Sequence, residues 1–331
     1  MKNILITGAL ERSNGFELGD GKYYGCAKLL KLNLESGAVT ELLSVAEGNE
    51  NFPNEHPNLQ FTSAYVEKAT LWLPMDTEIR KYNYPELKVL QTISHPCFQN
   101  IHSVTAIDGF LYATSTGLDT VAVLNKEEGN IVKLINAEGK STWHRFLADT
   151  DYRQVHSTRP HECHPNYVFK ANSKIWVTRC TQEDAICLDD FASVIDITGG
   201  SGIAVHDGVV LDDKIFFTAV DGCIMIADAN QKTVIETLEI NKLTEFDGVR
   251  GWCRGLLIDD DILYIGFSRL RKTRAKGKLA WVKKLAKRNK NDVFTYASIL
   301  AFDLKSGKIV ADYPLPEESI HAIYSVINEP S

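Results

Sequence analysis

A segment of similar character recurs along this chain at intervals of about 40 to 45 residues. The six copies open at Phe61, His102, His164, His206, Cys253 and His321. Three of the five intervals are 41, 42 and 47 residues, and the two longer ones contain insertions. Each complete copy supplies four short apolar runs separated by Asp, Gly or Asn turns, a pattern typical of antiparallel strands. This period, with four strands in each unit, predicts a β-propeller.

The two ends of the chain complete each other. Residues 3–9 have the character of the second strand of a unit, and no first strand precedes them. Residues 321–326 have the character of a first strand and stand alone at the far end. We therefore expect the C-terminal strand to pair with the N-terminal blade, which closes the ring and leaves no long free sheet edge.

The prediction is one all-β domain over residues 1–331, a single six-bladed propeller. The blades are expected at residues 1–45 with 320–327, 59–95, 100–137, 162–198, 204–240 and 251–316.

This pattern resembles the six-bladed propellers that include NHL repeats, strictosidine-synthase-like proteins and the senescence-marker/gluconolactonase group. The resemblance extends over the whole chain and is one of architecture. The metal-binding Glu, Asn and Asp sets of those families do not transfer to this chain, which carries histidines instead.

Composition limits the class of protein. No stretch approaches the roughly 18 apolar residues of a membrane span, and the N-terminus lacks the pattern of a secretory leader. The seven cysteines are odd in number and scattered, which indicates a reducing, cytoplasmic location. The sequence contains no phosphate-binding loop, nucleophile elbow or nucleic-acid motif, so no specific nucleic-acid partner is expected.

The long connections are expected to gather on one face of the ring. Strands in a blade alternate in direction, so the links from fourth to first strand and from second to third strand share a face. These links include 8–27, 46–60, 138–162 and 241–251, whereas the links on the other face are short. Function is often carried by loops on a rigid scaffold. We therefore expect the site on this face, with 138–162 as a lid-like loop.

Four histidines stand at the same point of the repeat: His102, His164, His206 and His321. At the start of the innermost strands they would converge on the axis, where several neutral imidazoles can bind one transition metal. The expected cofactor is one divalent ion of iron, manganese, zinc or copper. Two alternatives stay open: structural histidines that form hydrogen bonds between blades, and a polar pocket without metal.

Four further residues are candidates for catalysis. Arg254 could hold an anionic group of a substrate or form a salt bridge within its blade. Asp207 could orient an imidazole or be an ordinary Asp-Gly turn residue. His161 and Glu162 end the loop 138–162 and lie near His164 in the sequence. Their alternative is a solvated loop position.

A strongly basic segment interrupts the last blade. Residues 269–290 contain 11 basic residues and no acidic one, while the rest of the chain carries 25 basic against 43 acidic residues. Apolar residues at helical spacing predict a short amphipathic helix at about 269–291. The segment could bind an acidic protein or an anionic membrane surface, or it could be a solvated loop.

Two functions follow from these observations. The first is a metal-dependent hydrolase, lyase or oxygenase that acts on a small, anionic molecule at the axial histidines. The second is a non-catalytic propeller scaffold whose loop face binds an acidic protein or a membrane.

Overall fold

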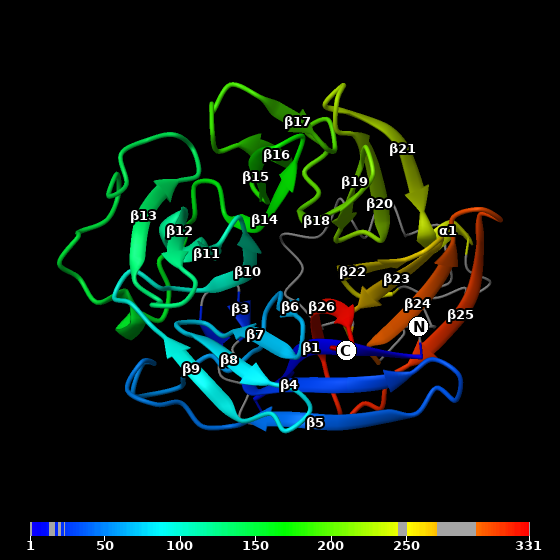
Figure 1. Cartoon of the computed structure of the whole chain (residues 1–331), viewed down its shortest axis with the longest axis horizontal. Helices are drawn as coiled ribbons and strands as arrows, with labels where there is room; N and C mark the ends of the chain where they lie inside the picture. The colour runs from blue at the N-terminus through cyan, green and yellow to red at the C-terminus, as the bar shows by residue number, and fades with distance from the viewer. Residues whose placement is uncertain are drawn as a thin grey trace.

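The computed structural model describes residues 2–12, 17–18, 21–22, 24–243, 250–269 and 296–330. Six four-stranded antiparallel sheets stand around a central axis (Figure 1). The expected all-β six-bladed propeller is confirmed. The described helices are α1 (Ile240–Leu243) and the 3-10 turns η1 (Thr116–Leu118) and η2 (Tyr152–Gln154). None of the helices in these ranges has the length and apolar character needed to cross a membrane.

The strands of the six blades follow, each from the innermost strand outward. Blade 1 contains β26 (Ala322–Asn328), β1 (Asn3–Glu11), β4 (Tyr24–Asn33) and β5 (Val39–Val45), with the small hairpin β2 (Glu17–Leu18) and β3 (Gly21–Lys22) between β1 and β4. Blade 2 contains β6 (Tyr65–Glu67), β7 (Thr70–Pro74), β8 (Ile79–Asn83) and β9 (Val89–Ile93). Blade 3 contains β10 (Ile101–Ile107), β11 (Phe110–Ser115), β12 (Thr120–Asn125) and β13 (Ile131–Asn136).

Blade 4 contains β14 (Pro165–Ala171), β15 (Lys174–Arg179), β16 (Asp184–Cys187) and β17 (Val194–Asp196). Blade 5 contains β18 (Val205–Leu211), β19 (Lys214–Ala219), β20 (Cys223–Asp228) and β21 (Thr233–Glu239). Blade 6 contains β22 (Cys253–Asp259), β23 (Ile262–Phe267), β24 (Ser298–Asp303) and β25 (Lys308–Pro314).

The chain closes on itself in blade 1. Strand β26 pairs antiparallel with β1, in a register that runs from Ile4 opposite Asn328 to Ala9 opposite Ala322. The register shifts at Gly8, where a Cβ atom would lie 1.9 Å from the carbonyl oxygen of Ala322. Only glycine lets the two backbones come this close. The expected closure by the C-terminal strand is confirmed.

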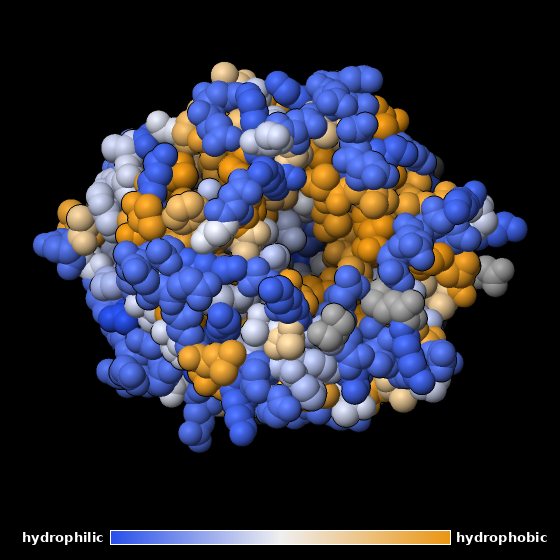
Figure 2. All heavy atoms as spheres, viewed as in Figure 1, coloured by the Kyte–Doolittle hydropathy of each residue, from blue (hydrophilic) through white to orange (hydrophobic). Residues whose placement is uncertain are grey.

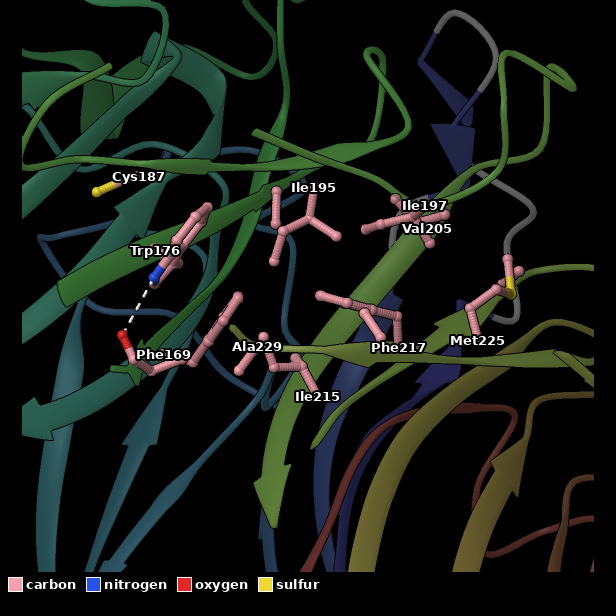
Figure 3. Close-up of a cluster of buried hydrophobic side chains, with 14 residues drawn as sticks. Phe169, Trp176, Cys187, Ile195, Ile197, Val205, Ile215, Phe217, Met225 and Ala229 are labelled. Carbon is pink, nitrogen blue, oxygen red and sulfur yellow. Dashed lines mark hydrogen bonds between the residues drawn. The ribbon is translucent and has the colours of Figure 1, made fainter. Parts of the chain in front are cut away.

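Apolar side chains fill the space between neighbouring blades. Between blades 4 and 5, Phe169 and Trp176 pack against Ile215 and Phe217, and the indole of Trp176 donates to the carbonyl of Ala171 (Figure 3). Each such fully buried large side chain contributes roughly 1.5–3 kcal/mol. The wedges between blades hold the innermost strands rigidly around the axis.

The two faces of the ring differ in their connections. Short turns join the first two strands in blades 2 to 6. At Asp108 and Gly109 both φ angles are positive (50° and 85°), as in the hairpin turn of type I′. The links between blades on the other face are long, the longest being the segment between β13 and β14. The basic insertion expected at about 269–291 lies outside the described residues, except for Arg269.

Candidate functional site

A cavity of about 330 Å³ lies where the innermost strands begin, and residues of all six blades line it. Its volume is at the lower end of the range of small-molecule sites. The long connections surround it, as the sequence predicts for the functional face. Figure 2, drawn in the view of Figure 1, shows a hollow near the ring axis, with hydrophilic residues around much of it and a hydrophobic wall on one side.

Three of the four repeated histidines line this cavity: His102, His164 and His206. The fourth, His321, does not line it. Its Nδ1 atom accepts the backbone N–H of Glu11 at 3.1 Å, and its own backbone N–H donates to Ala9. His321 therefore supports the pairing of β26 with β1 inside blade 1 and forms neither the expected metal ligand nor, in these bonds, a link between blades.

The hydrogen bonds of His102 determine which ring nitrogen carries the proton. Its Nδ1 lies 3.0 Å from the carbonyl oxygen of Asn100 and 2.8 Å from Oγ1 of Thr116. The Thr116 hydroxyl itself donates to the carbonyl of Pro165. Nδ1 of His102 must therefore be the donor, which leaves Nε2 of the neutral ring as an acceptor. This Nε2 has no hydrogen-bond partner within the described ranges.

His164 is paired with His161, and one buried carboxylate positions both. The Nδ1 atoms of the two rings are 2.7 Å apart, and the ring of His164 lies 4.8 Å from that of His102. Asp119 accepts the backbone N–H groups of Glu162, Cys163 and His164 at 2.9–3.0 Å. This carboxylate thereby fixes the backbone that carries the histidine pair.

Arg254 contacts His206 in the cavity. A guanidinium N–H of Arg254 donates to Nδ1 of His206 at 2.9 Å, and the guanidinium carbon lies 4.8 Å from the centre of the Tyr324 ring. Since Nδ1 of His206 accepts, its Nε2 carries the proton and is a donor. No carboxylate of the described residues lies within 4.0 Å of Arg254. The salt bridge considered for Arg254 within its blade is absent from this part of the chain.

Asp207 has no hydrogen bond to an imidazole. Its carboxylate accepts the hydroxyl of Thr218 at 2.5 Å and the backbone N–H of Gly255 at 3.0 Å. Its φ angle of 59° lies in the left-handed region, next to a register shift between β18 and β19. The residue therefore forms the bulge and links blades 5 and 6, and Arg254 is the residue that orients His206.

The loop between β13 and β14 contributes one of its two candidates to the cavity. His161 lines it, together with His156, Ser157 and Arg159. Glu162 does not; its carboxylate is bound by Lys140 at 2.8 Å on the outer side of the loop. His161 therefore faces the cavity, whereas the neighbouring Glu162 is held by an ion pair away from it.

Burial keeps the cavity histidines neutral. It lowers the pKa of His102, His164 and His206 well below the usual range, and the positive charge of Arg254 lowers each pKa further. Burial also lowers the pKa of His161 to about 4, with a further effect of Arg159. Neutral imidazoles at pH 7 can accept or donate one hydrogen bond at each free nitrogen.

Sequence reasoning missed an acidic residue of blade 2 that lines the cavity. Asp76, between β7 and β8, lines the cavity and is 5% exposed. Its Oδ1 accepts from Nδ2 of Asn58 at 2.9 Å and lies 3.5 Å from Nε2 of Gln60. Burial raises the pKa of Asp76 to about 7, while the Asn58 hydrogen bond and nearby His156 act to lower it. Asp76 stands at no repeated position, so no signal in the sequence marks it.

The expected four-histidine metal centre finds no geometric support. Among the residues that the structure describes, no three His, Cys, Asp or Glu side chains are placed to hold one ion. His321 lies outside the cavity lining, and the Nδ1 of His206 is engaged by Arg254. A bound transition metal stays a prediction.

The comparisons with known proteins place the fold and nothing finer. No protein-family model and no curated protein matches this sequence. A crystal structure of a protein of unknown function from Bacteroides caccae is similar over 99% of both chains, with a TM-score of 0.62 and 11% identity. The WD40 propeller domain of Doa1 is similar over 98% of this chain and 86% of its own, with a TM-score of 0.53 and 14% identity. Identities this low show a shared propeller fold alone.

Proposed function

We propose that this protein is an enzyme that acts on a small anionic molecule bound in the axial cavity. The observation that carries the proposal is Arg254, a positive charge that lines the cavity without a carboxylate partner in the described part of the chain. One of its N–H groups donates a hydrogen bond to His206, which leaves the remaining N–H groups of the guanidinium for a ligand. A planar guanidinium matches a carboxylate or phosphate with two parallel hydrogen bonds.

The neutral imidazoles supply the acid–base groups for a reaction beside that anion. Nε2 of His102 is an acceptor and can take a proton as a general base. Nε2–H of His206 is a donor and can stabilise negative charge on the substrate. A base and a donor around one bound anion suit hydrolysis or elimination next to the anionic group.

A metal-dependent form of the same reaction is the second candidate, and the hydrogen bond of His102 favours it. Metal-binding histidines commonly donate their other ring N–H to a backbone carbonyl, as His102 does to Asn100. The ring of His164 is 4.8 Å away. These two imidazoles would hold a divalent ion of iron, manganese, zinc or copper, which would supply a Lewis acid.

Ligand-induced stabilisation tests the anion site. We expect small carboxylates or phosphate to raise the melting temperature of the wild-type protein and to have no effect on Arg254→Gln. Lys170→Gln is the control, because it removes a positive charge from the outer surface, where Lys170 pairs with Asp108. Equal stabilisation of wild type and Arg254→Gln would contradict the proposal.

Metal analysis tests the metal-dependent form. Stoichiometric transition metal in the purified wild-type protein, lost in His102→Ala combined with His164→Ala, would support it. A protein that binds no anion and no metal, yet captures an acidic protein or anionic vesicles, would instead support the scaffold function.

A further inference from the structure

We infer that the cavity binds a zwitterionic small molecule of the amino-acid type, with its anionic group at Arg254 and its ammonium group at Asp76. The inference rests on the proposed function, because it assumes the anion site at Arg254. It adds a second binding position, in blade 2, to the same cavity.

Asp76 has the features of a ligand-binding carboxylate. It is 5% exposed, and both hydrogen bonds that it receives from side chains go to one oxygen, Oδ1. Oδ2 makes no hydrogen bond to any described residue, although it belongs to a side chain that lines the cavity. No Lys, Arg or His nitrogen in the described ranges lies within 4.0 Å of this carboxylate. A buried carboxylate without a cation is costly, and a cationic group of a ligand would remove that cost.

Asn100 offers a second acceptor next to Asp76. The backbone N–H of Ile101 donates to the carbonyl of Asp76, which brings Asn100 to the same wall. Asn100 lines the cavity, and its φ angle of 53° holds it in the left-handed region. Its side-chain amide has no hydrogen bond within the part of the chain that the structure describes. An ammonium group could therefore donate to Oδ2 of Asp76 and to the amide oxygen of Asn100.

One chain of contacts links the two charged positions. Arg254 lies over the ring of Tyr324, the hydroxyl of Tyr324 donates to Oε1 of Gln60 at 2.5 Å, and Nε2 of Gln60 lies 3.5 Å from Asp76. The wall between the positive and the negative group is thus built of side chains that bind each other. Its charges are those that complement a zwitterion, since neither Arg254 nor Asp76 has an ion-pair partner among the residues that the structure describes.

A matched set of ligands tests the inference. The probes are the ω-amino acids from glycine to 6-aminohexanoate, the straight-chain carboxylates of the same lengths, and the corresponding ω-hydroxy acids. Dissociation constants are measured by calorimetry on the full-length protein. At one chain length we expect the amino acid to bind roughly tenfold or more tighter than its carboxylate, the gain of one charge-assisted hydrogen bond.

Substitutions at the two positions assign the two ends. Asp76→Asn, a change of nearly equal shape, should abolish the preference for the amino acid and keep the binding of the carboxylate. Arg254→Gln should abolish the binding of both. Asp108→Asn is the control, because it removes a carboxylate from the exposed pair with Lys170. The comparison of ligands on the wild-type protein stays decisive even if a variant does not fold.

Each result has one meaning. Equal affinities for amino acids and carboxylates would overturn the zwitterion and leave the anion site in place, and hydroxy acids that bind as tightly as amino acids would overturn the ammonium position. Binding of neither series would overturn the proposed function itself. The preference should also increase as the pH rises through about 7, the pKa to which burial raises Asp76, with His156 as the titratable group that faces it.

Discussion

At the scale of single residues, two buried carboxylates, Asp119 and Asp76, differ in how completely their oxygens are hydrogen-bonded. Both carboxylate oxygens of Asp119 accept hydrogen bonds, from three backbone N–H groups and from an N–H of Arg145 at 2.7 Å. In Asp76, only Oδ1 accepts hydrogen bonds, and Oδ2 has no hydrogen-bond partner in the described residues. The first is built to hold the backbone in place, and the second is open to a ligand.

Asp119→Asn should destabilise the protein. The amide keeps the shape but replaces one acceptor oxygen by a donor, and the charge that binds Arg145 is lost. We expect the free energy of unfolding in urea to fall by about 3 kcal/mol, and the binding of anions to weaken because His164 loses its support. Asp108→Asn, at an exposed ion pair, should change the free energy of unfolding by less than about 1 kcal/mol. Equal effects of the two substitutions would contradict this role.

Asp76→Asn should change how stability depends on pH. The pKa of Asp76 is about 7 in the folded protein, raised by burial from a value of 3.8 for the free group. The folded state therefore binds this proton more tightly than the unfolded state. Protonation of Asp76 stabilises the folded protein fully below pH 3.8, and this stabilisation is lost as the pH rises through 7.

The Asp76→Asn variant carries no carboxyl group at this position, so its stability does not fall as the pH rises through 7. Relative to wild type it should gain stability between pH 4 and pH 8, by an amount on the order of 4 kcal/mol. Urea titrations at several pH values measure the difference. A constant difference between wild type and variant over that range would show that Asp76 keeps an ordinary pKa.

At the scale of secondary-structure elements, β26 decides whether the ring closes. It forms the innermost strand of blade 1, and its backbone contacts β1 along the register from Ile4 to Ala9. The burial of Ile323 and Val326 joins it to the core between blades 1 and 6. Without this strand, blade 1 would lose its inner edge and blade 6 its neighbour.

A chain that ends at residue 319 should not unfold cooperatively. We expect the near-ultraviolet circular dichroism and the thermal transition of the full chain to disappear in this truncated protein. A synthetic peptide of residues 320–331 should restore both, because it supplies the missing strand, and a peptide of the same composition in scrambled order is the control. A truncated protein that melts like the full chain would contradict the closure.

At the scale of the whole molecule, charge is distributed unevenly. The net charge of −7 combines a strongly acidic body with the basic residues of 269–290. Arg269, the described end of this segment, binds Glu11 at 2.7 Å and Glu317 at 3.2 Å, so the segment starts at the seam of blades 1 and 6. An anion that approaches this acidic body would be attracted to the basic segment.

Deletion of residues 270–290 should leave the propeller folded and weaken its association with anionic vesicles or acidic proteins. Vesicle co-sedimentation at increasing salt measures this, since attraction between charges is screened. A variant with the basic residues of 271–290 changed to glutamine keeps the length of the segment and should behave like the deletion. Unchanged binding at low salt would indicate that the segment is a solvated loop.

The amino-acid sequence by itself determined the ring and its closure. The period of the repeat, the alternation of the strands and the turn residues act locally, so they can be recognised without tertiary contacts. The repeat also marked His102, His164 and His206, because equivalent positions of a ring converge on its axis. Arg254 and His161 were found as their neighbours in the sequence, and both line the cavity.

Only the tertiary structure decided which groups are paired and which are left open in the cavity. His321 stands at a repeated position, yet its imidazole accepts the backbone N–H of Glu11 and does not line the cavity. Asp76, Asn100 and Asp119 belong to no repeated position, and they matter because of burial and of contacts with distant segments. Desolvation and hydrogen-bond pairing depend on the complete set of neighbours around a side chain, which exists only once the blades have packed.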